Sequence, residues 1–179
     1  LTGVVVAAGW GAVITFLPAV SPDQALRGMV FWLMGDLGQP ELPLWEPVIL
    51  LVGTLLAYLL AREINVLARG GSQAAAFGVS VERLRLLLFL LASLLTATAV
   101  TLAGSVGFVG LVVPHMIRLM GGSDHRLLVP ASVLLGGGLL TLSDILARTL
   151  LAPQQLPVGV VTALLGVPLF LYLLQRSGR

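Results

Sequence analysis

Long uncharged stretches alternate with short polar segments along the chain. A helix needs about 20 apolar residues to cross the roughly 30 Å of hydrocarbon in a bilayer. The mostly apolar stretch from residue 86 to residue 120 is too long for one crossing, because a helix rises about 1.5 Å per residue. We place its break in residues 104–110, where three glycines weaken a helix. The pattern predicts six crossings, at residues 1–20, 45–61, 84–103, 106–120, 127–151 and 156–174, the fourth short and tilted or partly re-entrant.

The segment after the first crossing is too large for a simple turn. Residues 24–34 have a helical pattern that is apolar on much of its surface. The pattern predicts a short helix in the outer membrane interface, with Trp32 at the depth of the lipid headgroups. The residues expected to cap or end this helix are Ser21, Asp23, Gly35 and Gly38.

A second large segment, residues 62–85, connects the second and third crossings. Residues 70–80 predict a short alanine-rich helix with a glycine at each end, polar enough to leave the membrane. Such an element is either a mere connector or a docking element for a soluble partner. Its spacing does not decide between these two interpretations.

The composition agrees with a membrane protein. Of the 179 residues, 58% are hydrophobic and 10% are charged, and the mean hydropathy is +1.04. Soluble domains average roughly 45–50% apolar and about 25% charged residues, so a soluble enzyme is excluded. The net charge of +2 is a small arginine excess and no argument for nucleic acid. The absence of cysteine excludes thiolate catalysis, cysteine-ligated zinc and iron–sulfur clusters.

The distribution of arginine predicts the orientation in the membrane. Eight of the ten arginines fall on one set of connecting segments, and positive charge favours the cytoplasmic side. These are Arg62, Arg69, Arg83, Arg85, Arg118, Arg126, Arg176 and Arg179. The opposite segments hold Asp23, Asp36, Glu41 and Glu46 against Arg27, with Arg148 near the other outer turn. Both ends of the chain are therefore expected in the cytoplasm.

Few residues could carry chemistry. The chain has no HExxH pair and no phosphate-binding P-loop sequence. Asp144 and Arg148 stand four residues apart on one helical face and can pair, since either charge alone would cost about 2.5–3.5 kcal/mol in a membrane. They could form a structural ion pair, a proton relay or an arginine for an external partner. His115, after Pro114, is expected to be a satisfied structural histidine, and Asp124 is expected to cap the next helix.

Four stretches make the chain recognisable. Residues 104–126 read GSVGFVGLVVPHMIRLMGGSDHR, and residues 143–173 read SDILARTLLAPQQLPVGVVTALLGVPLFLYL. Residues 31–37 (FWLMGDL) and 77–85 (FGVSVERLR) precede them. Together these stretches resemble the membrane subunits of ABC importers for iron–siderophore, haem and cobalamin uptake, the FecCD-type or type II permeases. The resemblance runs in order along essentially the whole chain.

The resemblance implies an all-helical membrane bundle without a cofactor of its own, with an outer helix and short cytoplasmic coupling helices. Its implied partners are cytoplasmic ABC ATPases that hydrolyse the ATP, an extracytoplasmic substrate-binding protein, a second permease subunit and membrane lipid. The residues assigned to ATPase coupling are Gly70, Ala74, Phe77, Gly78, Val79 and Arg83. Gly71 and Ser72 stand where acidic residues are usual, and Ala75 where arginine is usual, so the coupling contacts are expected to be less polar.

Arg148 matches an outer arginine that, in cobalamin importers, meets a glutamate of the binding protein. Family permeases are about twice as long, so residues 1–179 correspond to the C-terminal part of a single transmembrane permease domain. The chain is either a fragment or one of two chains, and alone it is not expected to transport.

We expect import of iron–siderophore complexes across the bacterial inner membrane by alternating access, with cobalamin or haem as alternative cargo. A proton-coupled carrier that uses Asp144, Arg148 and His115 is a rival hypothesis, and an intramembrane hydrolase with a serine–histidine dyad is a third.

Overall fold

The computed structural model describes residues 2–38 and 43–177, and every regular element in this part is a helix. The expected all-helical fold is confirmed. Two of the charges counted above, Glu41 and Arg179, lie outside the described residues. The helices are α1 (Thr2–Ala19), α2 (Asp23–Leu33), α3 (Trp45–Leu59), α4 (Ala61–Leu67), α5 (Gly71–Ala76), α6 (Val81–Ala103), α7 (Val109–Gly121), α8 (His125–Thr149) and α9 (Val158–Ser177).

Each of the six expected crossings contains a helix, but the helices differ in length. Three of them, α1, α6 and α8, are long and apolar enough to cross a membrane. A fourth span results if α3 and α4, which meet at an angle of 54°, are counted together. The shorter apolar helices are α7 and the Val158–Leu173 part of α9. With 13 residues, α7 is about 20 Å long, which fits the expectation of a short element.

The break expected within residues 104–110 is confirmed, but α7 begins later than expected. The expected start at Val106 is wrong, since the helix starts at Val109. Phe108 has a φ of 66° in the left-handed region, which prevents the helix from extending back through it. The sequence pattern does not reveal this, because phenylalanine rarely takes that conformation.

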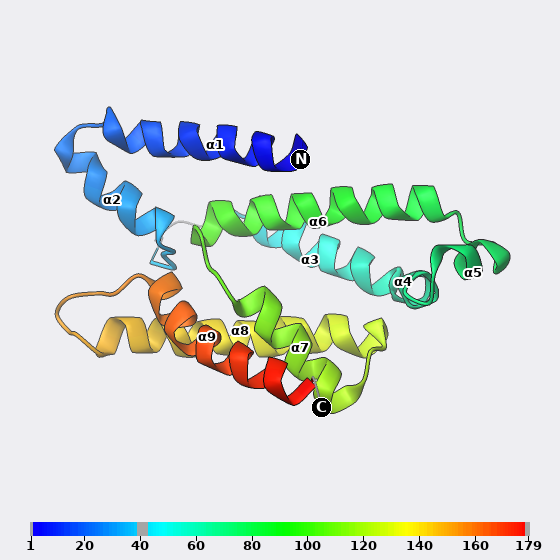
Figure 1. The fold of residues 1–179 in the computed structure, drawn as a ribbon. Helices are drawn as coiled ribbons and strands as arrows, with labels where there is room; N and C mark the ends of the chain where they lie inside the picture. The colour runs from blue at the N-terminus through cyan, green and yellow to red at the C-terminus, as the bar shows by residue number, and fades with distance from the viewer. Residues whose placement is uncertain (1, 39–42, 178–179) are drawn as a thin grey trace.

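The helices form two groups that meet along α3. In Figure 1, α3 runs behind α6, and α7, α8 and α9 pack together below them. A small core lies between α7 and α8, where Val113, Ile117 and Leu128 are buried. The short helices α4 and α5 and the α7–α8 turn lie at one end of the bundle, the α5 end. The opposite end, where α2 meets the end of α6 and the start of α9, is the α2 end.

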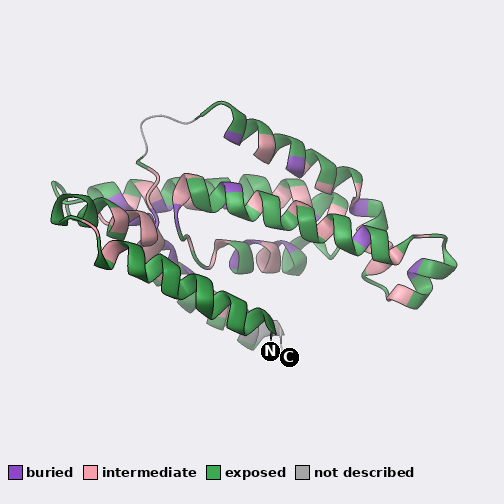
Figure 2. Cartoon of the chain, turned by 90° about the horizontal axis from the view of Figure 1, so that it is seen from above, coloured by how far each residue is buried: buried purple, intermediate pink, exposed green. Residues whose placement is uncertain are grey.

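Most of the apolar surface of this chain is exposed. Figure 2 shows α1 exposed along nearly its whole length, and none of its residues is buried. On α8, Leu134 is 77% exposed, and large apolar side chains of α3 and α6 are exposed as well. Monomeric soluble proteins rarely expose such continuous apolar surface. The fold therefore needs lipid or further protein around it.

The boundaries of α2 correct one expectation and confirm another. Neither Ser21 nor Asp23 caps the helix, because the N-cap position is Pro22 and has no side-chain hydrogen bond. Instead, the Ser21 hydroxyl donates to the carbonyl oxygen of Leu17 at 2.6 Å, and so belongs to the end of α1. Gly35 ends α2 as expected, with a φ of +90°.

Three glycines bring backbone segments into direct contact at the α2 end. A Cβ atom on Gly104 would collide with the carbonyl oxygen of Trp32, and one on Gly159 would collide with that of Met34. A Cβ atom on Gly35 would lie 3.0 Å from the nitrogen of Gly159. We call Gly35, Gly104 and Gly159 the glycine contact. Two backbone hydrogen bonds reinforce it, from Asp36 N to Ala103 O (3.0 Å) and from Val158 N to Gly35 O (2.9 Å).

Candidate coupling and docking sites

The short helix α5 lies between two positions whose backbone conformation favours glycine. Gly70 precedes it with a φ of 127°, and Gly78 follows it with a φ of 80°. At the C-terminal end, the backbone N–H of Val79 donates to Ala74 O at 3.0 Å, and that of Gly78 donates to Ala75 O at 3.0 Å. This pair of bonds is a Schellman motif, which requires a left-handed residue at the position of Gly78. The expected glycine-bounded helix is therefore present.

A hollow of about 450 Å³ opens beside α5, between α4 and the segment that follows α5. Phe77 stands at its edge and is 75% exposed, which is unusual for a phenylalanine outside an apolar span. We call this surface the coupling hollow. It is lined by Arg62, Glu63, Val66, Phe77, Gly78, Val79 and Ser80.

The structure distributes the expected coupling residues over three places. Phe77, Gly78 and Val79 lie together in the coupling hollow. Gly70 and Ala74 shape and anchor α5, and the side chain of Ala74 is fully buried. Arg62 and Glu63 also line the hollow, and sequence reasoning missed them. The one signal in the sequence is that two adjacent opposite charges, Arg62 and Glu63, directly follow the second expected crossing.

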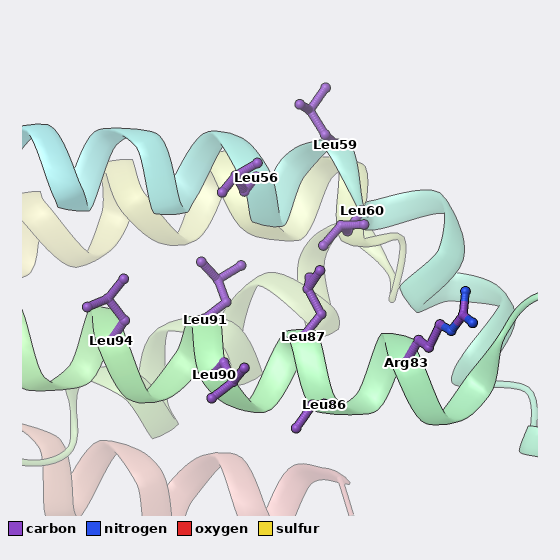
Figure 3. A pocket seen from close by; sticks show the side chains of 9 residues that line it. All are labelled: Leu56, Leu59, Leu60, Arg83, Leu86, Leu87, Leu90, Leu91 and Leu94. Atoms are coloured by element: carbon purple, nitrogen blue, oxygen red, sulfur yellow. The ribbon is translucent and has the colours of Figure 1, made fainter.

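Arg83 does not line the coupling hollow. It lies at one end of a groove of about 560 Å³ between α3 and α6 whose other lining residues are all leucines. Figure 3 shows its guanidinium directed away from the leucines, toward α4. The neighbouring Arg85 reaches α5 instead, since a Cβ atom on Gly71 would lie 3.4 Å from its Nη2 atom.

On α4, Asn65 contacts the start of α8. Its Nδ2 donates to Asp124 Oδ1 at 2.6 Å, and its Oδ1 accepts from the backbone N–H of His125 at 2.9 Å. The same Oδ1 lies 2.7 Å from His125 Nδ1, which donates when the ring carries its proton there. Asp124 caps α8 as expected, through the N–H of Arg126 at 2.9 Å. The Arg126 N–H, and then the Asn65 amide, hold the pKa of Asp124 below its usual range.

At the α2 end, the expected ion pair is present. Arg148 Nε donates to Asp144 Oδ2 at 2.8 Å, and the two side chains are 42% and 27% exposed. A turn lies next to the guanidinium, since a Cβ atom on Gly38 would lie 3.7 Å from Arg148 Nη2. In that turn, Asp36 Oδ1 accepts from the N–H of Gly38 at 2.8 Å. Within residues 2–38 and 43–177, the Nη groups of Arg148 make no hydrogen bond.

His115 is not the hydrogen-bonded histidine that we expected. Its Nε2 atom is buried without a partner among the described residues, and its ring meets the edge of Phe170 at 6.2 Å between centroids. In the described part of the chain, no hydrogen bond joins it to Asp144, to Arg148 or to a serine, and no cluster of three metal-binding side chains occurs. This geometry supports neither the proton relay nor the hydrolase dyad.

A family model described as the FecCD transport family matches residues 1–176. The chain belongs to the FecCD transport family. The hemin transport system permease protein HmuU of Yersinia pestis is 43% identical over 188 residues, which cover 99% of this chain and 55% of HmuU. The cobalamin import system permease protein BtuC of Halobacterium salinarum is 44% identical, over 98% of this chain and 47% of BtuC.

A solved structure supports the same fold. It is an inward-facing conformation of an ABC transporter classed provisionally as metal-chelate type, and it matches with a TM-score of 0.83 and 32% identity. The match covers 97% of this FecCD chain and 57% of the solved chain. The FecCD chain thus spans about half the length of the curated relatives that it matches.

Proposed function

We propose that this FecCD chain is the C-terminal part of a single transmembrane permease domain in an ABC importer. The importer moves iron–siderophore complexes across the bacterial inner membrane by alternating access, and a separate ATPase hydrolyses the ATP. The observation that carries this proposal is α5, a short helix fixed between Gly70 and Gly78 beside an open hollow. Family membership supplies the context.

The coupling hollow has the features of a docking surface for a soluble protein. An exposed aromatic side chain such as Phe77 contributes strongly when a partner buries it. Arg62 and Glu63 supply charges of both signs at the rim, which fix the orientation of a partner more than they add affinity. The Schellman motif at Gly78 keeps α5 in one conformation, so little order is lost on binding. We assign this surface to the cytoplasmic ATPase.

The opposite end offers a complementary site for the substrate-binding protein. Asp144 accepts from Arg148 Nε, so the two Nη groups of this partly exposed side chain remain available to a partner. A guanidinium presents its remaining N–H groups to a carboxylate in a geometry that lysine cannot match. We assign Arg148 to a carboxylate of the extracytoplasmic binding protein. A second permease subunit and lipid cover exposed helices such as α1.

The proposal also names the cargo, an iron–siderophore complex. The solved relative of metal-chelate type supports an iron chelate. The named hemin and cobalamin permeases support haem or cobalamin as the second candidate, at similar identity. Uptake into vesicles of a ferric siderophore, haemin and cobalamin, each competed with the other two, separates these candidates.

The test of coupling is co-purification of the complete permease with its ATPase in detergent, for wild type and Gly78→Trp. Gly78→Asn is the matched control, because asparagine tolerates a positive φ and adds little bulk. We expect the complex in wild type and Gly78→Asn and its loss in Gly78→Trp, whose side chain meets nothing within 4 Å in the permease at its Cβ but occupies the docking surface. Tryptophan is also strained at a φ of +80°, so thermal denaturation of the permease alone shows whether α5 is still intact. If no ATPase binds the wild type, or if Gly78→Trp binds normally, the coupling assignment is wrong.

A further inference from the structure

The helix α4 contacts two different parts of the molecule on its two faces. Arg62, Glu63 and Val66 face the coupling hollow. Asn65 lies on a different side of the helix and reaches the turn between α7 and α8. A seven-residue helix is only about 10 Å long and moves as one body. A displacement applied at the hollow therefore reaches Asn65 directly.

The contact that Asn65 makes joins segments far apart in the sequence. Asp124 and His125 follow it by 59 and 60 residues. Its three polar interactions, at 2.6, 2.9 and 2.7 Å, use both the donor and the acceptor of one amide. An amide that is engaged on both sides resists rotation and translation more than a single hydrogen bond does. Asn65 is half-buried, and its two interactions with His125 are partly buried, whereas its bond to Asp124 is exposed.

Besides the Asn65 contact, α4 packs directly against α8, but this packing is not polar in the described residues. The bend of 54° between α3 and α4 breaks the continuous helix, so a push on α4 is not carried along the axis of α3. No salt bridge joins the two groups of helices within residues 2–38 and 43–177. The Asn65 amide is thus the polar connection between the coupling hollow and the long helix α8.

We infer that Asn65 is a positioning residue that transmits movement of the docked ATPase from α4 to α8, through Asp124 and His125. This inference rests on the proposed function, because it presumes that the ATPase binds at the coupling hollow. Asn65 itself touches neither ATP nor cargo. It determines whether α8, which carries Arg148 at its far end, follows the movement of α4.

The test uses a polarity swap in the complete permease, reconstituted in vesicles with its ATPase and binding protein. Asn65→Asp places a carboxylate against Asp124 and removes the donor. The double variant Asn65→Asp with Asp124→Asn removes the repulsion between like charges and restores a donor and an acceptor across the contact. Because Asp124 Oδ1 accepts from both Asn65 Nδ2 and the Arg126 N–H, the amide at position 124 can serve either the contact or the cap of α8 through that atom, but not both. Gln175→Glu, which adds one negative charge on an exposed residue near the same end, is the matched control.

We expect Asn65→Asp to bind the ATPase and hydrolyse ATP within about twofold of wild type, while cargo moved per ATP falls at least fivefold. The double variant, which no longer sets two like charges together, should recover part of the lost transport, and Gln175→Glu should behave as wild type. Thermal denaturation of each complex separates loss of coupling from loss of folding. Wild-type transport per ATP in Asn65→Asp, or no recovery in a folded double variant, overturns the inference. Failure of the wild-type permease to bind an ATPase contradicts the proposed function instead.

Discussion

The backbone at Gly104 lies directly against the carbonyl oxygen of Trp32, with no room for a Cβ atom between them. Gly104 also has a φ of +67°, so a side chain there is strained as well as crowded. This contact joins the end of α6 to the end of α2.

Gly104→Ala is therefore expected to destabilise the permease by about 1–3 kcal/mol, the usual cost of overpacking, or by more if the backbone cannot shift. Gly107→Ala, three residues later, is the control, because a Cβ atom there meets nothing within 4 Å. Thermal denaturation in detergent measures both. Equal midpoints for the two variants would show that the contact at Gly104 is loose.

Phe77→Ala is expected to weaken ATPase binding about tenfold or more, as truncation of a buried interface aromatic usually does. The stability of the permease alone should not change, because Phe77 is 75% exposed. Affinity is measured with the detergent-solubilised permease and the purified ATPase. The control is Phe89→Ala, which removes another exposed phenylalanine, on α6, where no ATPase can reach it from the aqueous phase. A similar loss in both variants would argue against a contact at Phe77.

Arg148→Glu is expected to lower the affinity of the binding protein about tenfold or more, since it replaces attraction by repulsion. It also places a carboxylate beside Asp144 and Asp36, so Arg148→Gln accompanies it and should show a smaller loss. Arg27→Glu, on an exposed position of α2, controls for the change in net charge. The affinity is measured by passing each permease variant over binding protein immobilised on a surface. Unchanged affinity in Arg148→Glu would remove this residue from the docking site.

The cap formed by Asp124 predicts a pH dependence with a definite sign. Its ordinary pKa is 3.8, and the Arg126 N–H and the Asn65 amide lower the value in the folded state. The stabilisation is therefore complete above pH 3.8 and is lost as the pH falls through the lower folded value. The difference in melting temperature between wild type and Asp124→Ala should be larger at pH 5 than at pH 3. A difference that grows toward low pH would contradict the assigned hydrogen bonds.

Patterns that act over short distances were predictable from the sequence. Hydropathy located every long helix, and the four-residue spacing of Asp144 and Arg148 predicted their ion pair. The glycines at both ends of residues 70–78 predicted α5, because a short helix between positions of positive φ needs glycine there. The cap at Asp124 followed from the same kind of local argument.

Contacts between distant segments were not predictable. Nothing near Asn65 indicates that it bonds residues about 60 positions away, since an asparagine in a polar segment is ordinary. The separation of Arg83 from Phe77 depends on the direction in which α6 leaves α5, which hydropathy does not encode. His115 was misjudged for a related reason, because its ring meets Phe170 of α9, 55 residues away, and its buried Nε2 finds no partner in the described residues.

The glycine contact and Asn65 hold the two ends of the bundle in different ways. Backbone packed on backbone cannot slide without collision, whereas the Asn65 amide joins α4 to α8 through three polar interactions of side chains and backbone. The α2 end thus acts as a fulcrum. Since α6 has 23 residues and is about 34 Å long, a rotation of about 10° about that fulcrum moves its far end by about 6 Å. If the ATPase docks at the α5 end as we propose, a stroke of about this size there tilts α6 while the α2 end stays almost still.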